Sequence, residues 1–272
     1  MGNTAIKTVE KIKKQINPQL NDVQDREIDC QENKEYDYED LLQSNSVPYN
    51  QIFKLRIKHK QIQTNLYSSC LSIGNFVRLC KNLRSLSITL NYYKLIDKQF
   101  SSMMKDFSGF KYIIRLEINL CYSKLGEKAL KELWNQVSKI QTLQYLVLDL
   151  TKNRIDNKIT QDFISSVIQL KTIKWLSLNL NENYLTNDGL NLLLQLYQSY
   201  QDINYIQLYL DYNLVTWKGI FDFCKELSKF KKLYQLDFSA RYIIDSYPNG
   251  TITIQKFMRK SKRLIKIQLF DE

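Results

Sequence analysis

Few residues in this sequence have the types and spacing that catalysis requires. The single histidine, His59, has no second histidine with which to form an acid–base or metal site. The five cysteines are widely spaced and form no CxxC pair, which indicates reduced thiols instead of a zinc site or a disulfide framework. Neither GxGxxG nor GxxxxGK[ST] occurs, so no nucleotide loop is predicted. We therefore expect no enzyme activity: no catalytic residue, no metal, no cofactor and no small-molecule substrate.

A row of aromatic residues offers binding chemistry instead. Tyr145, Trp175 and Tyr205 lie thirty residues apart. Polar residues at related spacing accompany them, namely Asp149, Asn179, Tyr209 and Asp211. Aromatic rings flanked by acidic and amide side chains are typical of a protein-binding hot spot. The alternative is that the three rings only cover a sheet and pack on one another.

The elements that would position these residues follow a thirty-residue repeat. An alternating apolar pattern, typical of a strand with one buried face, recurs at Leu86, Leu116, Leu146, Leu176, Ile206 and Leu236. Two outer copies start at Leu55 and Ile267, each displaced by 31 residues. Alternate side chains of a strand point to opposite faces. The even-numbered leucines therefore predict a core face, and the odd-numbered residues, including the aromatic row, predict an open face.

Between the strands the apolar spacing changes to three and four residues, which indicates amphipathic helices. The set Leu190, Leu193, Leu194 and Tyr197 is the clearest. Asp188 is placed to cap this helix, because its carboxylate can accept hydrogen bonds from the free amides of the first turn. A strand and a helix within thirty residues cannot bury their own apolar faces, so the units must stack.

The turns after the strands carry a family resemblance. Asn153, Asn183 and Asn213 each follow the last leucine of a strand by three residues. The run Leu180–Gly189 resembles the LxxNxLxxxG stretch of leucine-rich repeats of the ribonuclease-inhibitor type. The resemblance implies an α/β solenoid, or horseshoe, with a parallel sheet on the concave side and helices on the convex side. It also implies that the Asn side chains bond neighbouring backbones along the turns. The sequence departs from this pattern at Tyr93, Ser123 and Ile243.

The two ends of the chain differ in charge. Residues 1–48 hold 6 bases and 10 acids, a net charge of −4, and are predicted to form a polar, acidic tail or a cap for the first repeat. Of the total of +11, this leaves +15 for residues 49–272, the predicted leucine-rich-repeat domain of about eight repeats. The sequence has neither an eighteen-residue apolar run nor an apolar N-terminal leader, so we expect a cytoplasmic protein without membrane contact.

Basic residues cluster near the C-terminus. This basic patch comprises Lys256, Arg259, Lys260, Lys262, Arg263 and Lys266. A second group comprises Lys225, Lys229, Lys231 and Lys232. Charges at such spacing usually form a solvated helix face. The functional alternative is docking to an acidic surface or to RNA, without base-specific recognition because no nucleic-acid motif is present.

Three functions remain open. The first is a non-enzymatic scaffold that binds a partner protein through the concave sheet, the general role that the resemblance implies. The second is a structural subunit of a large cytoskeletal, ciliary or ribonucleoprotein assembly, associated with the cytoskeleton or a cilium. The third is a regulator of a nuclease or a small GTPase. The +15 of the repeats argues against a basic nuclease as target, and no catalytic loop of a GTPase activator is identifiable.

Overall fold

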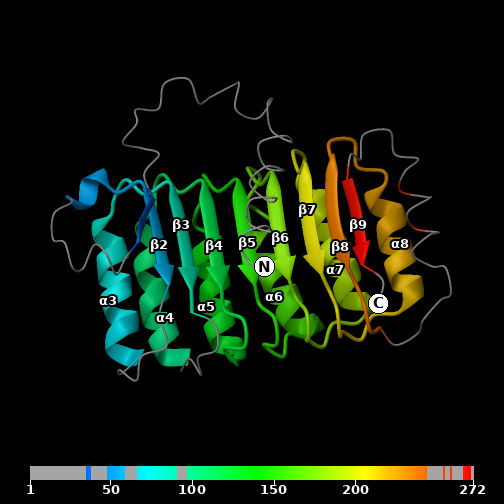
Figure 1. Cartoon of the computed structure of the whole chain (residues 1–272), viewed down its shortest axis with the longest axis horizontal. Helices are drawn as coiled ribbons and strands as arrows, with labels where there is room; N and C mark the ends of the chain where they lie inside the picture. The colour runs from blue at the N-terminus through cyan, green and yellow to red at the C-terminus, as the bar shows by residue number, and fades with distance from the viewer. Residues whose placement is uncertain are drawn as a thin grey trace, which may run out of the picture. The chain divides into compact units, whose positions relative to one another are not determined.

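A computed structural model describes residues 35–37, 48–58, 66–90, 97–243, 254, 258 and 266–270. The chain divides into two compact units, Met1–Lys34 and Glu35–Glu272, and every described residue belongs to the second unit. In this described part, strands alternate with helices, and the strands form one parallel sheet in chain order (Figure 1). The strands are β1 (Glu35–Asp37), β2 (Lys54–Lys58), β3 (Ser85–Thr89), β4 (Arg115–Asn119), β5 (Tyr145–Asp149), β6 (Trp175–Asn179), β7 (Tyr205–Tyr209), β8 (Gln235–Ser239) and β9 (Lys266–Phe270).

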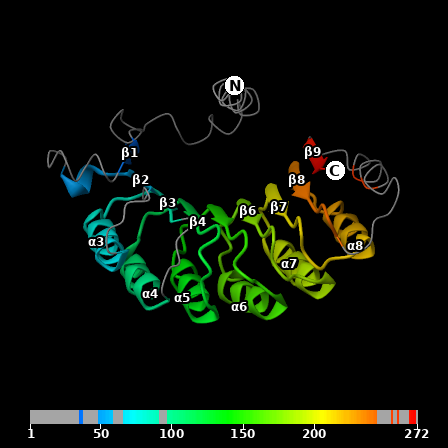
Figure 2. The same ribbon diagram turned by 60° about the horizontal axis from the view of Figure 1, so that its bottom comes forward.

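The helices between the strands lie on one side of the sheet (Figure 2). They are α3 (Leu66–Leu79), α4 (Asp97–Lys105), α5 (Glu127–Val137), α6 (Asn157–Val167), α7 (Asn187–Ser199) and α8 (Trp217–Leu227), with short 3-10 helices η1 (Tyr49–Gln51) and η2 (Asp106–Gly109). The predicted α/β architecture with a parallel sheet and packed helices is thereby confirmed. The sheet is open, with β1 and β9 as its two ends in the described residues. β1 lies within the segment predicted as a tail or cap, and it pairs with β2.

Strand register reproduces the thirty-residue repeat. From β3 to β8 each residue pairs with the residue thirty positions later, as in Leu116, Leu146 and Leu176. Strands β2 and β9 pair with a shift of 31 residues, which matches the displaced outer copies. The predicted positions of these strands are confirmed.

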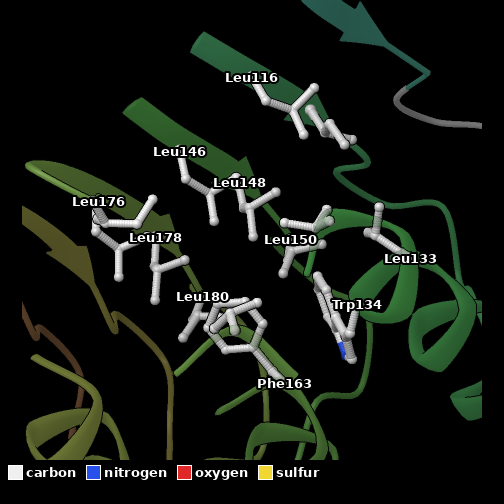
Figure 3. Close-up of a cluster of buried hydrophobic side chains, with 14 of the residues drawn as sticks. Leu116, Leu133, Trp134, Leu146, Leu148, Leu150, Phe163, Leu176, Leu178 and Leu180 are labelled. Atoms are coloured by element: carbon white, nitrogen blue, oxygen red, sulfur yellow. The ribbon is translucent and has the colours of Figure 1, made fainter. Parts of the chain in front are cut away.

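The even-numbered strand residues from β3 to β8 form the core, as predicted. Figure 3 shows leucines of successive strands in rows, with Trp134 of α5 and Phe163 of α6 beneath them. These two rings are buried and meet edge to face, with centroids 4.8 Å apart. Each helix buries one apolar stripe against these rows, so adjacent units share one continuous core.

Buried asparagines connect neighbouring turns, as the resemblance implies. Asn183 donates from Nδ2 to the carbonyl oxygens of Leu150 and Leu180, both at 3.0 Å. Its Oδ1 accepts from the backbone amides of Asn153 at 3.0 Å and Ile155 at 2.9 Å. Asn153 and Asn213 make equivalent bonds to the preceding turn.

Ser123 continues this ladder in the turn where the asparagine pattern is broken. Its side chain is buried, and its hydroxyl donates to the carbonyl oxygen of Leu90 at 2.9 Å, the same 33-residue offset that the asparagines use. The shorter serine side chain thus bonds the carbonyl group that is equivalent, one unit earlier, to those bonded by the asparagines.

The turns after β4 to β8 each contain a non-glycine residue in the left-handed region: Tyr122, Lys152, Glu182, Tyr212 and Tyr242, with φ between 54 and 59°. The first four donate their backbone N–H groups to a carbonyl of the next turn, at 2.8 to 3.0 Å. Inter-turn hydrogen bonds therefore hold a conformation that usually favours glycine, which is consistent with the low glycine content of 7.

The predicted cap of α7 is wrong by two residues. Thr186, in extended conformation, is the N-cap, and its hydroxyl accepts from the backbone amide of Asp188. Thr186 also exchanges two hydrogen bonds with the side chain of Asn157, at 2.7 and 3.1 Å. The N-cap is selected by this contact with the preceding unit, which the local sequence around Asp188 does not reveal.

Candidate functional site

The side of the sheet opposite helices α3–α8 carries the predicted binding residues. We call it the front face, and it consists of the strand side chains that point away from the helices. Tyr145, Trp175 and Tyr205 are the first residues of β5, β6 and β7 and are paired in register. The predicted aromatic row is therefore a real column across three adjacent strands.

The rings of this column pack unequally. Trp175 stacks on Tyr205 with centroids 3.4 Å apart and an interplanar angle of 18°. Tyr145 is tilted by 43° against Trp175 at 6.1 Å. At the outer end, the guanidinium carbon of Arg115 lies 5.9 Å from the centroid of the Tyr145 ring. The column thus runs from a cation over Tyr145 to a tight stack at Tyr205.

Exposure separates the three aromatic residues. Tyr145 and Trp175 are partly exposed, whereas Tyr205 is only 4% exposed. The hydroxyl of Tyr205 donates to Oδ2 of Asp237 at 2.6 Å. Burial raises the pKa of Tyr205, and the Asp237 carboxylate raises it further. The accessible part of the column is therefore Tyr145 and Trp175. The buried Tyr205 ring packs against one face of the Trp175 ring from the neighbouring strand.

A line of polar side chains lies next to the column. Ser177 donates to Oε1 of Gln207 at 2.5 Å, and Nε2 of Gln207 donates to the hydroxyl of Tyr209 at 2.6 Å. Tyr209 is partly exposed, and burial raises the pKa of its hydroxyl. These bonds hold three neighbouring side chains of β6 and β7 in fixed orientations.

Asp211 is placed differently from the prediction. It is 3% exposed. Its Oδ1 accepts from Ser239 at 2.5 Å and from the backbone amide of Arg241 at 2.8 Å, and its Oδ2 pairs with the Arg241 guanidinium at 2.9 Å. The carboxylate joins two turns and does not present an open oxygen on the front face.

Asp149 and Asn179 end their strands in the same way. Oδ1 of each accepts from the backbone amide two residues later, Thr151 at 3.1 Å and Asn181 at 3.2 Å. Oδ1 of Asp149 also accepts from the hydroxyl of Thr151 at 2.8 Å. Both Asp149 and Asn179 are partly exposed. Six of the seven predicted site residues therefore lie on the front face, where Tyr205 is buried, and Asp211 is buried in the turn after β7.

Cys80, Cys121 and Cys224 are free thiols. Cys80 and Cys224 are buried, and burial raises the pKa of each to about 12. Burial and the Asp149 carboxylate raise the pKa of Cys121 to about 11. Thiolate chemistry is thereby disfavoured at these three positions.

The predicted basic patch lies largely outside the described residues, as does His59. Only Lys266 of this patch is placed, as the first residue of β9 opposite Gln235. The second basic group is exposed along the end of α8 and the following turn. Within it, Lys229 pairs with Glu226, and Lys232 pairs with Asp202.

Sequence reasoning missed a row of side chains at the left-handed turn positions. The Tyr122 hydroxyl donates to Glu182 at 2.8 Å, and Lys152 pairs with the same carboxylate at 2.8 Å. Tyr212 and Tyr242 stack at 4.3 Å and are 53% and 60% exposed. The available signal was the same thirty-residue spacing, read three residues beyond the end of each strand.

Among the described residues, no group of three or more His, Cys, Asp or Glu side chains could hold a metal ion. Likewise, none of the helices in that part of the chain is long and apolar enough to cross a membrane.

Comparison with known proteins yields structural matches alone. No family model matches the chain, and no curated protein matches it. One similar solved structure is described as leiomodin-1 actin-binding site 2, at 11% identity and a TM-score of 0.40, covering 73% of this chain and 91% of the other. Another is a protein from Bacteroides fragilis, at 16% identity and a TM-score of 0.42, covering 78% of this chain and 52% of the other. Likeness at this level does not distinguish one function from another.

Proposed function

We propose that this chain is a non-enzymatic scaffold that binds a partner protein through the front face of its sheet. We also propose that its units are leucine-rich repeats of the ribonuclease-inhibitor type, arranged as a horseshoe whose concave side is the front face. The free thiols fit a reducing, cytoplasmic setting.

The observation that carries the proposal is the partly exposed pair Tyr145 and Trp175, which begin the neighbouring strands β5 and β6 on the front face. Aromatic side chains supply large contact area at low cost in conformational entropy, and they dominate protein-binding hot spots. Stacking on Tyr205 accounts for one face of the Trp175 ring. It does not account for the indole N–H, which has no hydrogen-bond partner among the described residues. This donor is therefore available to a carbonyl or carboxylate of a bound protein.

The test is a quantitative affinity purification with the wild-type chain, Trp175→Ala and a matched control, Tyr112→Ala. Tyr112 is 54% exposed and lies in the loop before β4, outside the front face. We expect a partner that the wild type and Tyr112→Ala retain and that Trp175→Ala loses by at least about tenfold, the effect of removing one hot-spot ring. Equal recovery with all three chains, each with an unchanged melting temperature, would contradict the proposal.

A further inference from the structure

Charge on the front face differs from the charge of the whole chain. The chain has 39 Lys and Arg residues and a net charge of +11. None of the nine front-face side chains of β5, β6 and β7 is basic: Tyr145, Val147, Asp149, Trp175, Ser177, Asn179, Tyr205, Gln207 and Tyr209. Basic front-face residues lie outside these three strands, as Lys54, Arg56 and Lys58 on β2 and Arg115 on β4. The centre of the face is thus free of cations in a chain that is rich in them.

Cations next to this centre are already paired with acids. Arg115 donates from Nε to Glu117 at 2.6 Å, and Arg241 pairs with Asp211. Asp237 is 6% exposed and accepts from Tyr205. Asp149 remains as the partly exposed acid of the central strands, and its negative charge has no ion-pair partner among the described residues.

Asp149 has one oxygen in use and one free. Oδ1 accepts both bonds from Thr151, whereas Oδ2 has no hydrogen-bond partner in the described part of the chain. Local contacts thus fix the orientation of the carboxylate and leave an acceptor for an incoming group. A charged donor gives the strongest bond to such an oxygen.

We propose that the partner presents an extended segment bearing Lys or Arg to β5 and β6, with a cationic side chain at Oδ2 of Asp149 and an apolar side chain over Trp175. This inference rests on the proposed function and specifies the chemistry of the partner. Asp149 and Trp175 are at opposite ends of adjacent paired strands, four residues or about 13 Å apart along the strand direction. An extended segment of about five residues spans that distance.

Binding is tested with the full chain and three fluorescein-labelled decapeptides, by fluorescence anisotropy at about 0.15 M ionic strength, where the charge of the whole chain is largely screened. One peptide alternates Arg and Leu, and in the others citrulline or Glu replaces each Arg. Citrulline keeps the shape of Arg without its charge. We expect the Arg peptide to bind at least about tenfold more tightly than the citrulline peptide, and the Glu peptide to bind least.

Two variants locate the site. Asp149→Asn keeps an oxygen for the Thr151 contacts and is expected to weaken binding of the Arg peptide about threefold to tenfold. Asp222→Asn makes the same charge change at an exposed position of α8, on the helix side, and is expected to leave the affinity unchanged. Equal affinity for the Arg and citrulline peptides, or equal effects of the two variants, would overturn the inference.

The inference and the proposed function fail in different ways. A partner that Trp175→Ala loses, combined with equal binding of the Arg and citrulline peptides, overturns the cationic segment and leaves the scaffold function standing. A partner that Trp175→Ala and Asp149→Asn both lose, while Asp222→Asn retains it, supports both. No loss with Trp175→Ala overturns the scaffold function and the inference that rests on it.

Discussion

Tyr197 and Tyr200, at the end of α7, are both buried but meet different surroundings with their hydroxyl groups. The Tyr200 hydroxyl donates to the carbonyl oxygen of Val167 at 2.9 Å. The Tyr197 hydroxyl has no hydrogen-bond partner among the described residues. A buried polar group without a partner costs free energy, whereas a satisfied one contributes about 1 kcal/mol.

Replacing each tyrosine by phenylalanine tests this difference. We expect Tyr200→Phe to lower the free energy of unfolding by about 1 kcal/mol and Tyr197→Phe to leave it unchanged or raise it by up to about 1 kcal/mol. Urea denaturation of the two variants and the wild type measures both values. A loss at Tyr197→Phe as large as at Tyr200→Phe would show that its hydroxyl does find a partner.

Glu182, one of the side chains at the left-handed turn positions, makes the stability of the fold depend on pH in the acid range. The Lys152 ammonium and the Tyr122 hydroxyl hold the pKa of Glu182 below its usual value of 4.5. A lowered pKa stabilises the fold above the unfolded value, and this stabilisation is lost as the pH falls through the folded value. We therefore expect the free energy of unfolding to fall less between about pH 5 and pH 3 in Glu182→Gln than in the wild type. Asp222→Asn controls for the change in total charge, and an unaltered slope in Glu182→Gln would contradict the prediction.

At the scale of the elements, the Asn ladder holds neighbouring units together. Asn183 makes three bonds through Nδ2 to backbone carbonyl oxygens of two turns and accepts two more through Oδ1. Ser123 makes one equivalent bond. We expect Asn183→Ala to lower the free energy of unfolding by about 2–4 kcal/mol and Ser123→Ala by about 1 kcal/mol, as thermal or urea unfolding would measure. Equal losses would mean that the number of inter-turn bonds does not set the stability.

Gly189 lies inside α7, where alanine would ordinarily stabilise a helix by about 1 kcal/mol. Here a Cβ would lie 2.6 Å from Oδ1 of Asn157, the atom that accepts from the Thr186 amide. We expect Gly189→Ala to destabilise the protein, because Asn157 must leave its place. A double-mutant cycle with Asn157→Ala checks this, since the two losses should be less than additive. Additive losses would exclude the steric explanation.

Most of the strands and the direction of their side chains could be predicted, and the reasons are physical. Alternation of Leu116, Glu117 and Ile118 specifies which face each side chain occupies, and the thirty-residue repeat specifies the register. Burial of Tyr205 could not be predicted in this way. It depends on Asp237, 32 residues away, which the hydroxyl of Tyr205 reaches across the sheet. Alternation specifies the direction of a side chain and not what lies around it.

At the scale of the whole described unit, stability comes from contacts between neighbouring units. Each strand pairs only with the strand before and the strand after it in the described sheet. Central units therefore have two stabilising interfaces, and end units have one. We expect the slowest amide hydrogen exchange in β5 and β6 and faster exchange toward β2 and β9, as hydrogen-exchange mass spectrometry would show.

A core substitution sharpens this prediction. Leu148→Ala removes a side chain that is 1% exposed and should cost about 2–5 kcal/mol. Protection of backbone amides from hydrogen exchange should fall first in β4, β5 and β6 and last in β2 and β9. Uniform loss of protection along the chain would indicate a single cooperative unit instead.

Because the register repeats every thirty residues, whole units of thirty residues could be removed from this protein or added to it. Removing residues 151–180 would join Leu150 to Asn181, so that β5 would be followed by the turn and helix that now follow β6. Tyr145 would then lie beside Tyr205, and every leucine row would still meet a leucine or isoleucine row. The front face would become narrower by one strand, about 5 Å, without a change in its core pattern. Duplication of the same segment would widen the face by one strand. The width of the face that a partner can contact could therefore be changed one strand at a time, while the leucine rows of the core continue to pack in the same way.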